Sequence, residues 1–131
     1  MCIRDRFRLD DQILIKDNHL KIVGSITEAV RRAKRYSFSK KIEIEAETPE
    51  QAVEAAKAGA DVILLDNMSP EMAAEAAKAV KEINTRIIIE VSGGIRPDTI
   101  VLYAPYADVI SVGYLTHSAP AADFSMDIKK M

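Results

Sequence analysis

Short apolar segments alternate with capped helical segments along nearly the whole chain, and this alternation limits the folds open to it. The apolar segments lie at residues 13–15, 41–46, 61–66, 87–92 and 108–112. The connections between them are short, each just long enough for one helix. Such a pattern predicts an α/β protein in which parallel strands are joined by right-handed helical crossovers.

The helical segments carry recognisable start and stop signals. Ser25 and Thr48 each begin a capping box, and Ser69 precedes a proline at the first helical position of an alanine-rich segment. Gly59 fits a helix C-terminus. Helices are therefore expected at about 26–36, 49–59 and 70–83, with a short fourth one after Pro97.

Length and charge exclude several functional classes. The 131 residues are enough for one domain with a core, and 48% of them are hydrophobic. A net charge of −2 gives no field for nucleic acid and no basic membrane patch. No apolar run approaches the ~20 residues of a membrane span, and no signal peptide is visible. With one cysteine, Cys2, an intrachain disulfide is excluded, so we expect a globular cytoplasmic chain.

Charged residues and glycines stand where each predicted strand ends. Lys16 closes the first strand, Glu45 lies near the end of the second and Asp66 closes the third. The fourth strand ends with Glu90 and Ser92-Gly93-Gly94, and the fifth with Ser111-Val112-Gly113. Parallel strands bring their carboxyl ends to one edge, which is where α/β folds bind ligands. We therefore interpret this edge as a candidate site.

Each of these residues also has a structural explanation. Lys16 could be a solvated charge, and Asp66 could help cap the helix that begins near Ser69. Glu43 and Glu45 share one face of their strand, which is simply a wet face on an edge strand but points inward in a barrel. Gly93-Gly94 could be a tight turn.

Taken together, the residue types favour a phosphorylated sugar as ligand. Lysine and glycine loops suit phosphates, whereas carboxylates suit ribose hydroxyls and the oxygen-ligated Mg²⁺. His19 and His117 have no further histidine or cysteine cluster that would indicate zinc, and we expect them to be structural. A sugar phosphate or a pyrophosphate is the predicted ligand.

Five segments, in order and with matching spacing, resemble the quinolinate phosphoribosyltransferase family. They are LIKDNH (14–19), IEIE (42–45), AGADVILLDN (58–67), EVSGGI (90–95) and DVISVGYLTHSAPAADFSM (108–126). The resemblance runs from about Leu9 to the C-terminus. It implies that residues 9–131 are the C-terminal part of an incomplete (β/α) barrel, with about five strands and four helices, and that residues 1–8 are a junction segment outside the family.

The resemblance also implies a reaction. Quinolinate and phosphoribosyl pyrophosphate would give nicotinate mononucleotide, pyrophosphate and CO₂ with Mg²⁺, in a cytoplasmic enzyme that is a homodimer or a higher homo-oligomer. Lys16, Glu45 and Asp66 would be catalytic and bind substrate, with Glu45 and Asp66 reaching the metal indirectly through substrate or water. The two strand-end loops, 92–94 and 111–113, would bind phosphate.

The chain also departs from the family pattern. Arg6 falls at the family's substrate-binding arginine position, but Asp5 replaces the histidine beside it, and residues 1–6, MCIRDR, are otherwise unlike the family, so we predict that they are not native to the gene. A full barrel needs about 250 residues, and the arginines that clamp the two quinolinate carboxylates are missing. Two alternatives therefore stay open: a paralogous phosphoribosyltransferase acting on another base, and a non-catalytic phosphate-binding or oligomerisation fragment.

Overall fold

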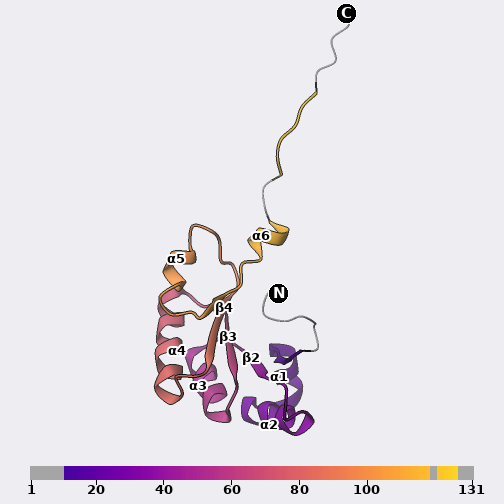
Figure 1. Cartoon of the computed structure of the whole chain (residues 1–131), viewed down its shortest axis with the longest axis vertical. Helices are drawn as coiled ribbons and strands as arrows, with labels where there is room; N and C mark the ends of the chain where they lie inside the picture. The colour runs from indigo at the N-terminus through magenta and orange to yellow at the C-terminus, as the bar shows by residue number, and fades with distance from the viewer. Residues whose placement is uncertain (1–10, 119–120, 127–131) are drawn as a thin grey trace, which may run out of the picture.

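A single parallel sheet forms the centre of the molecule (Figure 1). The computed structural model describes residues 11–118 and 121–126, and within them five strands lie in sequence order, each parallel to the next. The strands are β1 (Ile13–Ile15), β2 (Ile42–Ala46), β3 (Val62–Asp66), β4 (Ile88–Ser92) and β5 (Val109–Ile110). Sequential order is the order of a (β/α) barrel wall, so the predicted fold class is confirmed.

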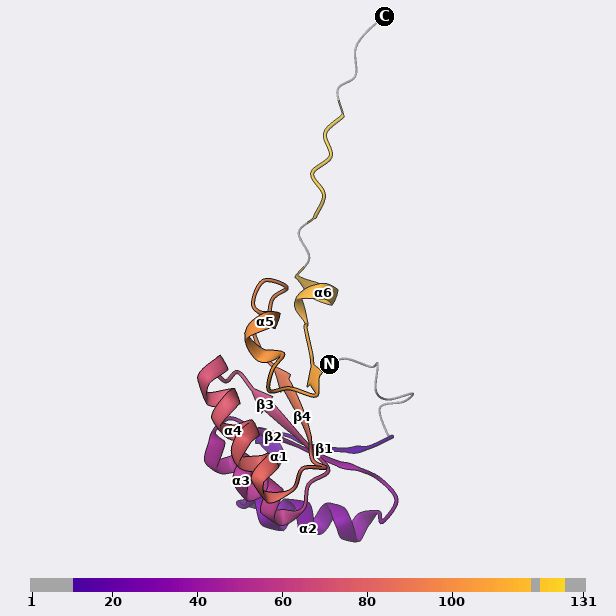
Figure 2. The same cartoon turned by 60° about the vertical axis from the view of Figure 1, so that its left-hand side comes forward.

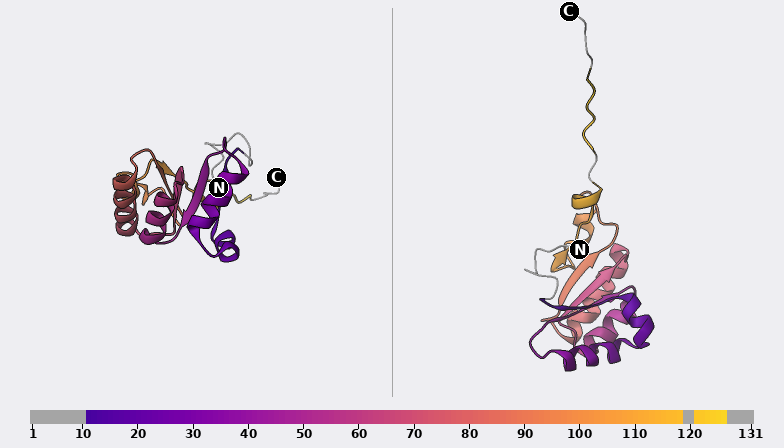
Figure 3. Two further views of the ribbon diagram at one scale, coloured as in Figure 1. Left: turned by 90° about the horizontal axis from the view of Figure 1, so that it is seen from below. Right: turned by 90° about the vertical axis from the view of Figure 1, so that its right-hand side faces the viewer.

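Six helices follow the strands in the described residues. They are α1 (Asp17–Val23), α2 (Ile26–Tyr36), α3 (Pro49–Ala58), α4 (Pro70–Ile83), α5 (Ile100–Tyr103) and α6 (Tyr114–His117). The long helices α2, α3 and α4 lie side by side along one face of the sheet (Figures 2 and 3). Of these described helices, none is both long enough and apolar enough to cross a membrane.

The predicted helix caps form as expected. The side chains of Ser25, Thr48 and Ser69 each accept a hydrogen bond of 3.3 Å from the backbone N–H three residues on, which satisfies one otherwise unpaired donor at the start of α2, α3 and α4. The Gly59 backbone (φ +84°) ends α3 in the left-handed conformation. These local signals explain why the bounds of the three helices follow from the sequence within a residue.

Alternate strand residues build the core under the helices. The helix-facing side chains are Ile42, Ile44 and Ala46 from β2, Ile63 and Leu65 from β3, and Ile89 and Val91 from β4, all of them buried. Buried alanines of α3 and α4 face them, and small side chains let these helices approach the sheet and each other closely. Ile42 and Ile44 thus pack against helices, which agrees with the barrel alternative for this strand.

The opposite face of the sheet carries carboxylates. The strand register places Glu45 beside Leu64 and Leu64 beside Glu90, so these three side chains lie in one row. Glu43, in the row below, is 1% exposed and accepts a hydrogen bond from the amide of Gln12. Both glutamates of β2 therefore point away from the helices, which is the inward direction of a barrel.

Three local features differ from the prediction. The helix α1 was not expected because no Ser, Thr, Asp or Asn precedes it; instead the His19 ring accepts a hydrogen bond from the Lys16 N–H, and Gly24 ends the helix. The short α6 was also missed. The strand β5 is shorter than the predicted 108–112, although the Ser111 N–H still donates to the Val91 carbonyl.

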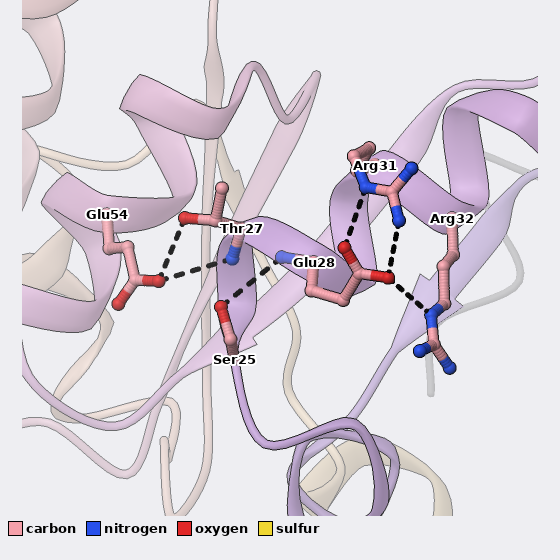
Figure 4. A network of polar contacts seen from close by, with 6 residues as sticks. All are labelled: Ser25, Thr27, Glu28, Arg31, Arg32 and Glu54. Carbon is pink, nitrogen blue, oxygen red and sulfur yellow. Dashed lines mark hydrogen bonds and ion pairs between the residues drawn. The ribbon is translucent and has the colours of Figure 1, made fainter.

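A polar network fixes the start of α2 (Figure 4). The carboxylate of Glu54, on α3, accepts hydrogen bonds from both the N–H and the hydroxyl of Thr27. The next residue, Glu28, accepts 2.7 Å hydrogen bonds from Arg31 and Arg32, one turn further along α2. These two arginines hold the pKa of Glu28 at about 2, below its usual 4.5.

Candidate functional site

All the predicted strand-end residues from 16 onwards lie at the carboxyl edge of the sheet. Lys16 follows β1, Glu45 is the penultimate residue of β2 and Asp66 is the last residue of β3. Ser92 ends β4, and Ser111 directly follows β5. Because every neighbouring strand pair is parallel, these residues come from five successive strands to one edge. Arg6 and the predicted junction segment 1–8 lie outside the described residues.

Lys16 and Glu45 face each other across β1 and β2. The Lys16 ammonium lies 3.8 Å from one carboxylate oxygen of Glu45, and the Asp17 N–H donates to the other at 3.3 Å. The Glu45 side chain is 9% exposed, whereas that of Lys16 is 49% exposed. A buried carboxylate is costly unless it has partners, and here it has a cation and an amide. Lys16 retains an open face for an anionic ligand.

Asp66 is half-buried at the end of β3. It lies in register with Ser92, and its carboxylate accepts a 2.7 Å hydrogen bond from the side-chain amide of Asn67. The N-cap of α4 is Ser69, which accepts from the Met72 N–H. The capping role that the sequence allowed for Asp66 is therefore taken by another residue.

The two glycine-containing loops line one pocket. A cavity of about 570 Å³ lies between the loops that follow β4 and β5, and all six predicted phosphate-binding residues are part of its wall. These are Ser92, Gly93, Gly94, Ser111, Val112 and Gly113. Loops separated by about twenty residues in sequence thus meet around a space large enough for a phosphorylated ligand.

The glycines are required by the geometry of this wall. Gly93 (φ +91°) and Gly94 (φ +63°) both have backbones in the left-handed region, which other residues rarely adopt. A Cβ on Gly93 would lie 2.4 Å from the side-chain oxygen of Asn67 and 2.7 Å from its backbone nitrogen. The loop after β4 therefore packs directly against the loop after β3.

Sequence reasoning missed further residues of the pocket. Its wall also contains Ile95, Arg96, Tyr114, Thr116, His117 and Ser118. The Arg96 guanidinium lies 5.3 Å from the centre of the Tyr114 ring, a cation–π contact that joins the two loops. These residues follow the predicted glycines in sequence, and this position is the signal by which they could have been predicted as pocket residues.

Glu90 was also left out of the predicted site. Its carboxylate accepts a 2.6 Å hydrogen bond from the buried Ser111 hydroxyl, so β4 holds the start of the loop after β5. The strand pattern placed Glu90 near the edge but gave no partner for it. The side-chain contact depends on the register of β4 and β5, which the sequence does not specify.

The edge therefore holds two groups of residues. The Lys16–Glu45 pair lies at β1 and β2, the glycine-lined pocket lies at β4 and β5, and Asp66 on β3 stands between them. The described residues contain no group of three or more His, Cys, Asp or Glu side chains arranged to hold a metal ion. A divalent cation at this edge would need most of its ligands from a bound substrate or from water.

Comparison with known proteins decides the family. The family model described as "Quinolinate phosphoribosyl transferase, C-terminal domain" matches residues 2–127. The chain belongs to this family. The resemblance drawn from the five sequence segments is therefore confirmed.

Curated and solved relatives agree with the family assignment. The chain is 52% identical to a "Probable nicotinate-nucleotide pyrophosphorylase [carboxylating]" of Methanothermobacter thermautotrophicus, over 95% of this chain and 46% of that protein. It is 54% identical to the protein of the same description from Methanocaldococcus jannaschii, over 94% and 45%. The structure of NadC from Streptococcus pyogenes matches with a TM-score of 0.74 and 43% identity, over 93% and 42%. The chain thus spans about half the length of these relatives.

Proposed function

We propose that the chain is the phosphoribosyl-pyrophosphate-binding part of an enzyme that transfers phosphoribose to quinolinate with decarboxylation, in NAD biosynthesis. The observation that carries the proposal is the carboxyl edge of the sheet, where a lysine–carboxylate pair, an aspartate and a glycine-lined pocket come from five successive strands. A ligand with a phosphate at one end and a pyrophosphate at the other needs two anion-binding regions separated by hydroxyl-binding groups. Phosphoribosyl pyrophosphate has that form.

In the proposed complex, the pocket between the loops after β4 and β5 binds one phosphate group. Gly93 and Gly94 let the backbone approach the phosphate closely, and backbone N–H groups of the two loops are the donors. Arg96, whose side chain is 61% exposed and whose guanidinium lies over the Tyr114 ring, adds a positive charge to the wall. Thr116 offers a hydroxyl on the same wall.

Asp66, Glu45 and Lys16 then face the reacting half of the ligand. Asp66 accepts hydrogen bonds from ribose hydroxyls, and the two carboxylates stabilise the positive charge that develops on the ribose as the bond to pyrophosphate lengthens. The half-exposed Lys16 ammonium binds the departing pyrophosphate. Glu45, held by Lys16 and by the Asp17 N–H, is pre-oriented for this work before any substrate arrives.

Magnesium fits this edge only as a shared ion. Among the described residues no protein cage for a cation is formed, so an ion held by pyrophosphate and water would reach Asp66 and Glu45 only through those ligands. When bound, the ion neutralises pyrophosphate charge. Both carboxylates therefore belong to the proposed site with an indirect metal contact.

The intact protein is proposed to be a cytoplasmic homodimer or higher homo-oligomer. Within the described part of the chain, β1 and β5 each pair with only one neighbouring strand, and Ile22, Tyr36 and Phe38 are largely exposed. Unpaired strand edges and exposed apolar side chains are normally covered in a stable protein. The missing carboxylate-binding arginines of the pyridine site would come from the part of the enzyme that this chain does not span, or from a second subunit.

Binding of phosphoribosyl pyrophosphate to the 131-residue chain tests the proposal. Equilibrium dialysis with radiolabelled phosphoribosyl pyrophosphate and Mg²⁺ compares the parent chain with Lys16→Ala and, as a matched control, Lys21→Ala. Lys21 lies on α1, the helix that begins directly after Lys16, and pairs with Asp17 at 2.7 Å at the solvent surface. We expect Lys16→Ala to weaken binding about tenfold or more, because one charge-assisted contact is lost, and Lys21→Ala to leave it unchanged. Equal effects of both variants would show that Lys16 contributes only general charge.

Substrate choice needs the longer protein. The gene is sequenced upstream of the Met1 codon, and the protein encoded by the extended reading frame is assayed with quinolinate, with nicotinate and with no base. Formation of nicotinate mononucleotide and CO₂ from quinolinate supports the proposed reaction. Turnover of another base alone would favour a paralogous transferase, and binding without any turnover would favour the non-catalytic alternative.

A further inference from the structure

One residue of the carboxyl edge combines an unusual backbone with contacts to two parts of the proposed site. Asn67 follows Asp66 and has φ +53°; in the described residues it is the one non-glycine residue with a positive φ. Asparagine tolerates this left-handed conformation better than most residues, yet the conformation still costs free energy and persists only where the surroundings hold it. Such strain points to a role in the site.

Three contacts hold the Asn67 turn in place. Its backbone N–H donates to the Ser92 carbonyl at 3.0 Å, which continues the β3–β4 pairing by one residue. Its side-chain oxygen lies in the space that a Cβ on Gly93 would need. The carbonyl of the next residue, the buried Met68, accepts a 3.0 Å hydrogen bond from the Tyr103 hydroxyl of α5. The turn is thus fixed against both the glycine loop and the helix beyond it.

Because the turn is held in this way, the side-chain amide of Asn67 points toward Asp66, the proposed catalytic carboxylate. The side-chain amide N–H donates to one oxygen of Asp66 at 2.7 Å. A carboxylate at the end of a strand can rotate about its side-chain bonds, and a fixed donor on one oxygen selects one orientation and leaves the other oxygen for a ligand. The left-handed backbone is what brings the amide back toward the preceding residue.

We propose that Asn67 is a positioning residue that orients Asp66 for the ribose hydroxyls and couples this orientation to the glycine loop of the phosphate pocket. The proposal rests on the proposed function, because it assumes that Asp66 contacts phosphoribosyl pyrophosphate. Asn67 itself acts through Asp66. Its backbone conformation and its side-chain donor are separate contributions, and glycine substitution separates them.

The decisive variant is Asn67→Gly. Glycine adopts φ +53° without strain, so a purely conformational role for Asn67 predicts unchanged binding and an unchanged or slightly altered urea midpoint. The positioning role predicts that Asn67→Gly weakens phosphoribosyl pyrophosphate binding about tenfold, because the fixed orientation of Asp66 is lost. Asn67→Ala, which lacks the donor and strains the backbone, should show the same loss of affinity and a lower urea midpoint as well.

A double-mutant cycle with Asp66→Asn tests whether the two residues act as one unit. If Asn67 acts through Asp66, Asn67→Gly has little further effect on affinity once Asp66 is replaced. An equal loss in both backgrounds would overturn the proposal, and so would unchanged affinity in Asn67→Gly alone. All affinities are measured on the full 131-residue chain by the equilibrium dialysis used for Lys16.

Ligand-free crystal structures of the parent and of Asn67→Gly separate this proposal from the proposed function. We expect the Asp66 carboxylate to hold one orientation in the parent and to rotate or become disordered in the variant. If phosphoribosyl pyrophosphate binds to neither protein but Asp66 rotates in the variant, the proposed function fails, and what stands is that Asn67 fixes the orientation of Asp66. If the ligand binds to the parent but Asp66 keeps its orientation in the variant, the positioning role fails and the proposed function stands.

Discussion

At single positions of the carboxyl edge, the space available for a side chain restricts the residue type as much as chemistry does. Gly93 and Gly94 adjoin each other in one loop and both have a positive φ, yet a Cβ on Gly93 would meet Asn67, whereas a Cβ on Gly94 has nothing within 4 Å. The two positions therefore differ in one physical respect. Gly93 is needed both for its positive φ and for the room it leaves for Asn67. Gly94 is needed for its positive φ alone.

This difference gives a prediction about stability. Gly94→Ala should lower the free energy of unfolding by about 1 kcal/mol, the cost of an alanine in the left-handed region. Gly93→Ala should lower it by about 2–4 kcal/mol, because the same strain is joined by a clash with the Asn67 backbone nitrogen. Urea unfolding followed by circular dichroism measures both values. Equal losses would mean that the loop after β3 moves aside at little cost.

At the scale of helices and strands, the sequence specified most of what the structure contains. The bounds of β2 and β3 were predictable within a residue from the alternating apolar pattern of β2 and the continuous apolar run of β3, and those of α2 and α4 from their capping residues. The helix α1 was not, because a histidine side chain takes part at its N-terminus in place of a usual cap. The position of Glu45 and Asp66 at the ends of predicted parallel strands also placed them at one edge.

The sequence pattern could not predict the contacts between the site residues. A period of two says which face a side chain occupies, but the pairing of Ser111 with Glu90 depends on the register of β4 and β5. The positive φ of Asn67 depends on the close approach of Gly93, a contact between two loops separated by α4. The pocket wall beyond the glycines likewise required the two loops to be placed together.

The cap of α3 makes a prediction at this scale. Thr48→Ala removes the acceptor for the Gln51 N–H, and we expect the free energy of unfolding to fall by about 1 kcal/mol. Thr48→Ser keeps the acceptor and should lose only a few tenths of a kcal/mol. Urea denaturation of the two variants measures the difference. A loss of the same size in both would show that the threonine methyl, and not the cap, matters.

The polar network of α2 predicts a pH dependence. Because Arg31 and Arg32 lower the pKa of Glu28 from 4.5 to about 2, the folded protein favours the ionised carboxylate. The stability from these contacts is therefore fully present above pH 4.5 and is lost as the pH falls toward 2. We expect Glu28→Gln to lower the urea midpoint at pH 7, with the difference from the parent shrinking between pH 4.5 and pH 2.

Salt provides the control for this network. Glu28, Arg31 and Arg32 lie at the surface, so 1 M NaCl should reduce the difference between parent and Glu28→Gln at pH 7. A difference that neither acid nor salt reduces would indicate that the substitution acts on helix propensity and not on the ion pairs.

At the scale of the whole molecule, the two faces of the sheet differ in their side chains and in what covers them. The helices α2, α3 and α4 cover one face, while the other carries Glu43, Glu45 and Glu90 among apolar side chains such as Leu64. Glu43, Glu45 and Leu64 on this second face are buried, whereas the large apolar side chains of Ile22, Tyr36 and Phe38 elsewhere are largely exposed. Copies of the chain could cover these side chains and the open edges of β1 and β5.

We therefore predict that the 131-residue chain is self-associated or poorly soluble and that, without further segments, it does not turn over quinolinate. Multi-angle light scattering after size-exclusion chromatography should give a mass above the 14.5 kDa of one chain. Co-expression with the N-terminal part of a homologous enzyme serves as the comparison. A stable monomer with full turnover would contradict both parts of this prediction.

The sequential strand order also bears on how the chain is made. Each strand pairs with the strand that follows it in sequence, so the longest contacts of the sheet span only one βα unit. Low separation between contacting residues favours fast folding, and a unit needs only its predecessor in order to dock. As the polypeptide leaves the ribosome, β1, β2 and β3 can therefore pair before β4 and β5 are synthesised. Asp66 would therefore be in place before the loop of Gly93 and Gly94, which packs against Asn67, has been synthesised.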